Sequence, residues 1–363
     1  MLNVLWLSFF FLAAASALWR WLVVDDPAVF AVILLFGTLT LWLGFLQSAE
    51  KAGLVERLAR FLSPLFARLM PEVPAGHPAL GLITMNFTAN ALGLDNAATP
   101  IGLKAMRELQ SLNPEPDQAS NAQILFLVLN ASSLTLLPVS IFMYRAQQGA
   151  PDPSLVFLPI LLATAASTLA GFISVVFMQR LRWRDPVVLI WLLGTALLLG
   201  GFIALLSTLS SAALASLSSV LGNAVLFGLI LVFLLAGALR KVAVYEAFIE
   251  GAREGFEVAK TLLPYLVAML CAVGVLRASG ALDILLAWIR GAVLWTGWDA
   301  RFVDALPTAL VKPFSGSAAR AMLIETMNTH GVDSFPALLA ATVQGSTETT
   351  FYVLAVYFGS VGI

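Results

Sequence analysis

The chain has 363 residues, of which 60% are hydrophobic and 11% are charged, and its mean hydropathy is +0.92. Soluble domains are about half apolar and about one-quarter charged, so a water-soluble fold of this size would lack a core large enough for this apolar surface. The net charge of −1 gives no electrostatic basis for nucleic-acid binding, and a single cysteine excludes an internal disulfide. We therefore expect an all-α polytopic membrane protein whose partners include membrane lipids.

A helix needs about 20 mainly apolar residues to cross a bilayer, and several runs approach that length. The N-terminal run has no basic leader and reaches Val24, which favours a first spanning helix over a signal peptide. No alternating pattern typical of a β-barrel accompanies these runs. The predicted spanning helices cover residues 2–24, 28–49, 121–143, 154–178, 187–206, 217–239, 261–276 and 335–358.

Other segments mix apolar and charged residues at helical spacing. In the first of them, Leu58, Leu62 and Leu65 recur on one face, and Arg57 and Arg60 fall between them. This pattern is typical of an amphipathic helix that lies in the membrane interface. The segments with this pattern are residues 50–70, 241–260 and 282–293.

Two apolar segments, residues 80–106 and 310–327, are interrupted by glycine, proline and polar residues. Such residues break helices, and irregular backbone at membrane depth is tolerated only where it is buried in protein or lines a wet cavity. We therefore predict re-entrant hairpins or broken helices in both. Polar clusters that begin at Asn130 and at Gln344 each start a long apolar run.

These elements occur in the same order twice, with a polar seam at residues 179–186. We predict two repeats, residues 1–180 and 186–363, and we expect the second to be truncated by one C-terminal helix. Lys and Arg concentrate in four segments, residues 50–70, 96–120, 179–186 and 240–260. The positive-inside rule places these segments and the N-terminus in the cytoplasm, and the count of crossings then makes the repeats inverted. The predicted location is a bacterial inner membrane.

The same segments resemble a known family. Residues 71–110 and 120–138 resemble spore maturation protein A, and residues 244–283, 312–322 and 333–363 resemble spore maturation protein B. The resemblance implies a fusion of the two and membership of the nucleoside recognition, or Gate, domain family. It also implies a further C-terminal helix and, by the name of the domain, recognition of nucleosides.

The candidate site consists of the polar side chains that sit within the apolar segments, because such groups are costly in a membrane and often mark a substrate path. In the first repeat they are Asn86, Asn90, Asp95, Asn96, Thr99, Asn130, Ser132 and Ser133. In the second repeat they are Lys312, Ser315, Ser317, Arg320, Gln344, Ser346, Thr347, Glu348 and Thr349.

Structural roles compete with each of these assignments. The asparagines and serines could cap broken helices or hold helices together. Lys312 and Arg320 could bind an anion at a helix N-terminus, or pair with Glu325 or Glu348. Glu348 is a candidate buried carboxylate that couples transport to H⁺ or Na⁺, and the alternative is a fixed ion pair.

No P-loop, nucleophile elbow or zinc-protease motif occurs, and the only histidines, His77 and His330, lie far apart in the sequence. We expect no enzymatic activity, no metal and no cofactor. The leading hypothesis is a transporter-like protein that binds a small polar or anionic solute, or a lipid headgroup, between the repeats. The alternative is a non-transporting membrane scaffold or regulator of envelope or spore maturation. Assembly into a homo-oligomer is left open.

Overall fold

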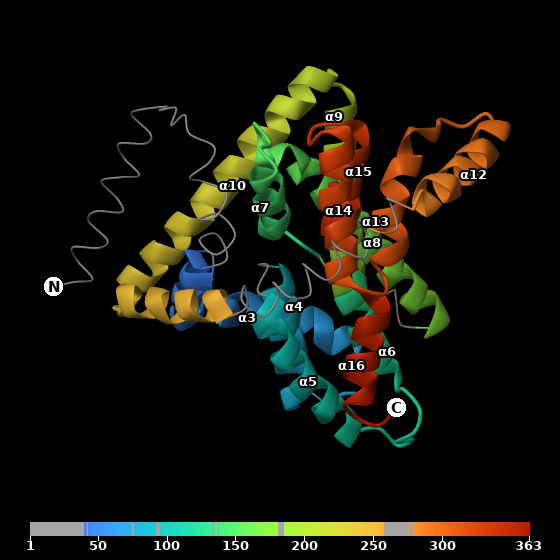
Figure 1. Cartoon of the computed structure of the whole chain (residues 1–363). Helices are drawn as coiled ribbons and strands as arrows, with labels where there is room; N and C mark the ends of the chain where they lie inside the picture. Colours follow the sequence, from blue (N-terminus) through green and yellow to red (C-terminus); the bar gives the residue numbers. More distant parts are fainter. Residues whose placement is uncertain are drawn as a thin grey trace.

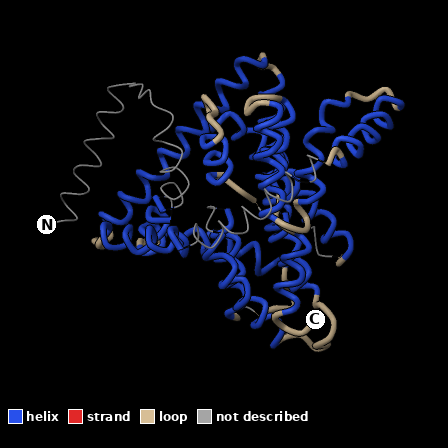
Figure 2. The backbone as a smooth tube through the Cα atoms, in the orientation of Figure 1, coloured by secondary structure: helices blue, strands red, loops and turns tan. Residues whose placement is uncertain are grey.

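The computed structural model describes residues 40–41, 43–74, 76–91, 95–132, 134–136, 138–180, 185–257, 275 and 279–363. Within these residues the chain forms helices joined by loops, and no strand occurs there (Figure 2). The first half contains α3 (Leu54–Leu69), α4 (Pro78–Ala91), α5 (Asp95–Ser111), α6 (Asn121–Ser132), α7 (Val139–Gln147), η1 (Pro153–Val156) and α8 (Phe157–Met178). The second half contains α9 (Pro186–Ser207), α10 (Ser211–Leu239), a helix over residues 244–257, α12 (Ala281–Trp295), η2 (Ala300–Ala305), α13 (Leu306–Val311), α14 (Gly316–His330), α15 (Phe335–Ser346) and α16 (Thr350–Gly359) (Figure 1).

Three helices are long and apolar enough to cross a membrane. They cover Pro153–Met178, Pro186–Ser207 and Ala212–Leu239. The spans predicted at 154–178, 187–206 and 217–239 are therefore confirmed, and the protein is a multi-pass membrane protein. The predicted span 2–24 lies outside the described residues, as does 261–276 apart from position 275, and the described end of 28–49 is helical.

Two predicted spans are wrong as continuous helices. The segment 121–143 is divided into α6 and α7, and the segment 335–358 is divided into α15 and α16. Both divisions fall at the polar clusters. At the second one, Thr347 is extended (φ −147°, ψ 160°), and the next backbone N–H, of Glu348, donates to Ala131 O at 3.0 Å instead of to its own helix. Hydropathy did not reveal these interruptions, because the residues on either side of them are as hydrophobic as those of a continuous spanning helix.

The segments predicted to be amphipathic are helical over most of their described residues, in α3, residues 244–257 and α12. Corresponding glycines precede the first and last of these helices. Gly53 (φ 68°) precedes α3, and Gly280 (φ 72°) precedes α12. A side chain would strain the backbone in this left-handed region, so the glycines allow the same sharp entry into both helices.

Side-chain caps set the starts of several helices. Asp185 accepts a hydrogen bond from the Val187 N–H at 2.9 Å at the start of α9, where Pro186 supplies a preformed first residue. Ser210 caps α10, and Ser334 caps α15, each at 3.3 Å. These caps satisfy backbone donors that would otherwise be left unpaired where the chain turns back.

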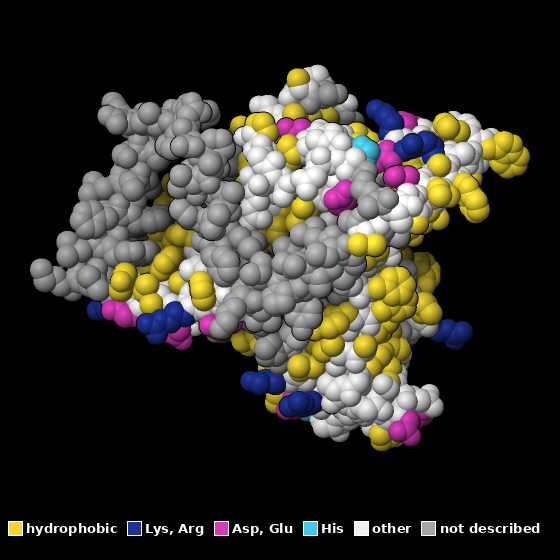
Figure 3. Space-filling view, viewed as in Figure 1, with side chains coloured by type: hydrophobic (Ala, Val, Ile, Leu, Met, Phe, Trp, Pro, Cys, Tyr) yellow, Lys and Arg dark blue, Asp and Glu magenta, His cyan; other side chains and the backbone are white. Residues whose placement is uncertain are grey.

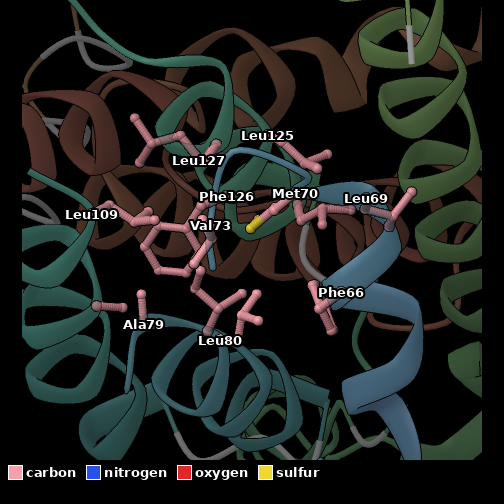
Figure 4. Close-up of a cluster of buried hydrophobic side chains, with 14 of the residues drawn as sticks. Phe66, Leu69, Met70, Val73, Ala79, Leu80, Leu109, Leu125, Phe126 and Leu127 are labelled. Carbon is pink, nitrogen blue, oxygen red and sulfur yellow. The ribbon is translucent and has the colours of Figure 1, made fainter. Parts of the chain in front are cut away.

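The core of the first half lies between α3, α4, α5 and α6 (Figure 4). Phe66, Leu80, Leu109 and Phe126 are among its buried members. The core continues across to the second half, since the Phe126 ring lies 5.7 Å from the ring of Tyr357 on α16. A shared core of this kind fixes α16 against the first half.

The surface of the second half carries large exposed apolar side chains. On and after α12, Trp288, Trp295 and Trp298 are 77%, 90% and 71% exposed. Figure 3 shows hydrophobic side chains on α12 and along the face beside it. Together with the long apolar helices, this surface implies contact with lipid, and tryptophan is enriched where such surfaces meet the headgroups.

Candidate functional site

Four helix interruptions lie next to one another although they are far apart in the sequence. They separate α4 from α5, α6 from α7, α13 from α14, and α15 from α16. Three backbone hydrogen bonds join them: Leu136 N–H to Ala91 O at 3.1 Å, Glu348 N–H to Ala131 O at 3.0 Å, and Phe351 N–H to Pro313 O at 2.9 Å. The interruptions of both halves therefore meet at one polar centre.

Three asparagines form a buried cluster in the first half, which we call the asparagine triad. Asn86 and Asn90 are one turn apart on α4, and Asn130 lies near the end of α6. Asn130 donates to the Asn86 side-chain oxygen at 2.7 Å, and Asn90 donates to the Asn130 oxygen at 2.8 Å. Asn86 donates to Ala98 O at 2.6 Å, which ties α5 to the cluster across the interruption.

A second-half tyrosine reaches this triad. Tyr357 on α16 is 4% exposed, and its side chain is hydrogen-bonded to Asn86 and Thr99. A Cβ atom on Gly102 would overlap the Tyr357 phenol, so the absence of a side chain at this position of α5 leaves room for the ring. The triad thus belongs to the contact between the halves as well as to the first half.

The N-terminus of α14 is formed by residues of the α13–α14 interruption. Ser315 caps the helix by accepting a hydrogen bond from the Ala318 N–H at 3.2 Å, and its hydroxyl lies 3.2 Å from that of Ser317. Lys312 is buried (7% exposed) where α13 ends. The predicted residues Lys312, Ser315 and Ser317 are therefore together, and Ser315 has the capping role that was its structural alternative.

Arg320 is one turn into α14. Its guanidinium carbon lies 5.4 Å from the centre of the Tyr144 ring on α7, in a cation–π arrangement. Its Nε atom is buried and has no hydrogen-bond partner within the described part of the chain. Arg320 therefore contacts the first half at the face of the Tyr144 ring, and its Nε–H group has no acceptor among the described residues.

The cluster at 344–349 closes the centre from the second half. Gln344 and Thr349 are buried, and Ser346 donates to Val343 O at 3.2 Å within its own helix. A Cβ on Gly316 would lie 3.3 Å from the Thr349 methyl, which brings α14 against this interruption. The Glu348 carboxylate is half-buried and interacts electrostatically with Tyr357.

The structure describes the remaining predicted residues less fully. Ser132 bonds to Leu129 O at 3.2 Å, which is a local structural contact. Asp95 and Asn96 begin α5, and their side chains lie outside the described part, as does Ser133. Within the described residues, no group of three or more His, Cys, Asp or Glu side chains gathers that could hold a metal.

Sequence reasoning missed two residues at this centre and a third at the far end of α7. Tyr144 and Tyr357 follow the two polar clusters at nearly equal distances, and this spacing, in a chain with five tyrosines, could have identified them. Arg145 is fully buried and donates to Val332 O at 2.9 Å and to the Asp333 carboxylate at 2.7 Å. Its bonds to Asp152 O and Pro153 O, at 3.1 and 3.2 Å, complete a connection between the halves at the end of α7.

Comparison with known proteins confirms the resemblance found in the sequence. Spore maturation protein B of Bacillus subtilis (strain 168) is 48% identical to the chain over 130 residues, which cover 36% of this chain and 71% of that protein. Spore maturation protein A of the same organism is 35% identical over 182 residues, which cover 48% of this chain and 93% of that protein. No solved structure matches the chain. The family model described as nucleoside recognition (Gate) matches residues 32–147 and 259–363, more than half of the sequence, and the chain therefore belongs to the Gate family.

Proposed function

We propose that the protein is a transporter-like protein of the bacterial inner membrane, without enzymatic activity. It binds or moves a small polar or anionic solute, nucleoside-like in character, or a lipid headgroup. The observation that carries the proposal is the meeting of four helix interruptions at a centre lined by buried polar side chains. In transporters, discontinuous helices that meet near the middle of the membrane supply backbone groups and side chains to a solute.

The course of the interrupted helices supports an inverted relation between the halves. The pair α6–α7 starts at Asn121, whose backbone O accepts a hydrogen bond from the Gln179 side chain at 2.9 Å. In its last turn, Arg145 lies beside Asp333. The pair α15–α16 starts just after Asp333, and α16 then packs along α6. The two pairs thus run in opposite directions, as the corresponding parts of an inverted repeat do. Re-entrant courses for α4–α5 and α13–α14 are part of the same proposal, and the packing of α4 on α5 and of α13 on α14 supports them.

The orientation proposed from Lys and Arg places the N-terminus in the cytoplasm. Segments assigned to that side contact one another: Arg68 lies 3.6 Å from Asp185, and Lys51 pairs with Glu250. This grouping supports one common side for these segments. Labelling of single introduced cysteines from either side of the membrane, in a variant without Cys271, tests the orientation directly.

Uptake by reconstituted protein tests the function. Purified protein in liposomes should accumulate labelled nucleosides above protein-free liposomes. Glu348→Gln, Asn96→Ala and Lys312→Ala should each reduce uptake, because all three lie at the interruptions. A robust uptake that none of the three changes would show that the assigned site is wrong. Tyr352→Phe, on an exposed side chain of α16, is the matched control.

The alternative function is that of a membrane scaffold or regulator of envelope or spore maturation. The asparagine triad favours it, because its amides satisfy one another and hold α4, α5 and α6 together without any solute. A scaffold would show no uptake, and its loss would alter the envelope even where every nucleoside is supplied. Copurification of a stable protein partner together with absent uptake would support this alternative.

A further inference from the structure

Three buried polar atoms of the second half find no hydrogen-bond partner among the described residues. They are the Gln344 amide oxygen, the Thr308 hydroxyl and the Arg320 Nε. Gln344 is 7% exposed and Thr308 is fully buried, so water does not solvate them freely. Native proteins keep few such atoms because each costs stability, and each calls for an explanation.

The three atoms belong to helices that pack together. Thr308 is on α13, Arg320 on α14 and Gln344 on α15, and these helices contact one another pairwise. Thr308 lies one turn before the α13–α14 interruption, Arg320 one turn after it, and Gln344 within one turn of the α15–α16 interruption. Since a turn rises about 5.4 Å and the two interruptions are joined at Phe351 and Pro313, the three residues lie within about one turn of a single junction.

The first half differs at the corresponding place. Its amides, those of the asparagine triad, are bonded to one another and to Ala98 O. The other unpaired atoms in the described chain belong to Thr88, Gln147 and Thr168, one each on α4, α7 and α8. Thr88 is two residues from both Asn86 and Asn90, which places it on another side of α4.

We propose that the second half supplies the hydrogen-bonding groups that hold the solute, and that the solute carries adjacent hydrogen-bond acceptor and donor groups. An acceptor is needed by the Arg320 N–H, a donor is needed by the Gln344 oxygen, and the Thr308 hydroxyl serves either. The asparagine triad then has a structural role: its hydrogen-bonded side chains position Tyr357 against the first half. The inference rests on the proposed function, since it names the half and the chemistry of that same site.

The stability of the empty protein tests the location without any knowledge of the solute. Gln344→Leu and Thr308→Val remove unpaired atoms, so each should raise the melting temperature by roughly 2 °C. Asn130→Leu breaks satisfied bonds and should lower it by several degrees or prevent folding. Thr326→Val is the control: the buried Thr326 hydroxyl donates to Met322 O at 2.8 Å within its own helix, and its removal leaves no other group unpaired. The melting temperature should therefore stay near that of the unchanged protein. If Gln344→Leu and Thr308→Val lower the melting temperature as much as Asn130→Leu does, the solute site is not in the second half.

Solute-induced shifts of the melting temperature test the chemistry. The probes are uracil and glucose, which offer donors and acceptors, and 1,3-dimethyluracil, which offers acceptors only. Uracil or glucose should stabilise the unchanged protein and lose that effect in Gln344→Leu, and 1,3-dimethyluracil should have no effect. Equal shifts with uracil and 1,3-dimethyluracil, or no shift with any probe, would overturn the solute class. A solute-induced shift of the melting temperature that depends on Gln344, without uptake into liposomes, would contradict the transport function and still support the binding site.

Discussion

Asn130 and Gln344 stand at corresponding places in the two halves, each just before a helix interruption, and their side-chain amides have different surroundings. The Asn130 amide bonds to Asn86 and Asn90 at 2.7 and 2.8 Å. The Gln344 oxygen meets no partner in the described part of the chain. Two amides that stand just before helix interruptions can thus differ in their partners, and the order of helices alone does not reveal which of them is satisfied.

The two halves are also joined differently at their two ends. At one end, the fully buried Arg145 bonds to Asp333 and to three backbone carbonyls. At the other, Lys51 pairs with Glu250 where both side chains are exposed. A buried charge depends on its partner far more than an exposed one, so these ends should respond to substitution very differently.

The largest expected effect follows from Asp333→Ala. It leaves the Arg145 charge buried with carbonyls alone. Because the Asp333 side chain is itself 45% exposed, we expect a loss of roughly 2–3 kcal/mol in the free energy of unfolding in detergent micelles. Glu250→Ala serves as control, because its pair with Lys51 is exposed on both sides, and it should change little. Similar values for the two variants would mean that the buried connection does not hold the halves together.

The next effect tests the asparagine triad. Asn86→Leu removes the acceptor of Asn130 and the donor to Ala98 O, and the expected loss is about 2 kcal/mol because those groups stay buried without partners. Unfolding in denaturant measures it. A stabilised protein would contradict the structural role assigned to the triad and would extend the solute site into the first half.

A smaller effect concerns the tyrosine that joins α16 to the triad. Tyr357→Phe keeps the ring against Phe126 but removes the hydroxyl bonded to Asn86 and Thr99, so a loss of about 1 kcal/mol is expected. The same substitution at Tyr352, which is 58% exposed, should have no measurable effect. Equal changes in the free energy of unfolding at the two positions would mean that the Tyr357 hydroxyl does not stabilise the contact between the halves.

The smallest effect is expected at the exposed pair of Lys51 and Glu250. The hydrogen bond and charge of Lys51 lower the pKa of the Glu250 carboxyl below its ordinary value of 4.5. The pair therefore stabilises the fold above that value and loses its contribution as the pH falls through the lower folded-state pKa. Glu250→Gln should slightly flatten the fall in melting temperature below pH 4.5, and high salt should cancel the difference. A large loss at neutral pH would mean that this end, like the other, is a buried connection.

Sequence patterns predicted the membrane class and the three long spans, because hydropathy is a local property. They did not predict the divisions within 121–143 and 335–358. The hydrogen bonds at these divisions join residues that are distant in the sequence, such as the Glu348 N–H and Ala131 O. A pattern read along one segment cannot reveal a partner that another segment supplies.

The candidate site shows the same limit. Polarity within apolar segments identified Asn86, Asn130 and Gln344, and the structure brings their helices together. Whether an amide is satisfied depends on partners from other helices, so sequence reasoning gave all three the same solute-binding role. Tyr357 was missed because a tyrosine in an apolar helix is ordinary until its hydroxyl is found beside Asn86 and Thr99.

The meeting of the two halves' interruptions at one centre underlies every proposal above, and a cysteine cross-link tests it most directly. In a variant without Cys271, Ala131→Cys and Glu348→Cys replace residues whose backbones are hydrogen-bonded at 3.0 Å. That proximity suits a disulfide, which needs Cα atoms roughly 4.4–6.8 Å apart. Mild oxidation in membranes should cross-link this pair rapidly, and should leave uncross-linked a control pair of Ala131→Cys with Ser334→Cys, at the far end of α15. Equal or absent cross-linking in the two pairs would mean that the interruptions of the two halves do not meet.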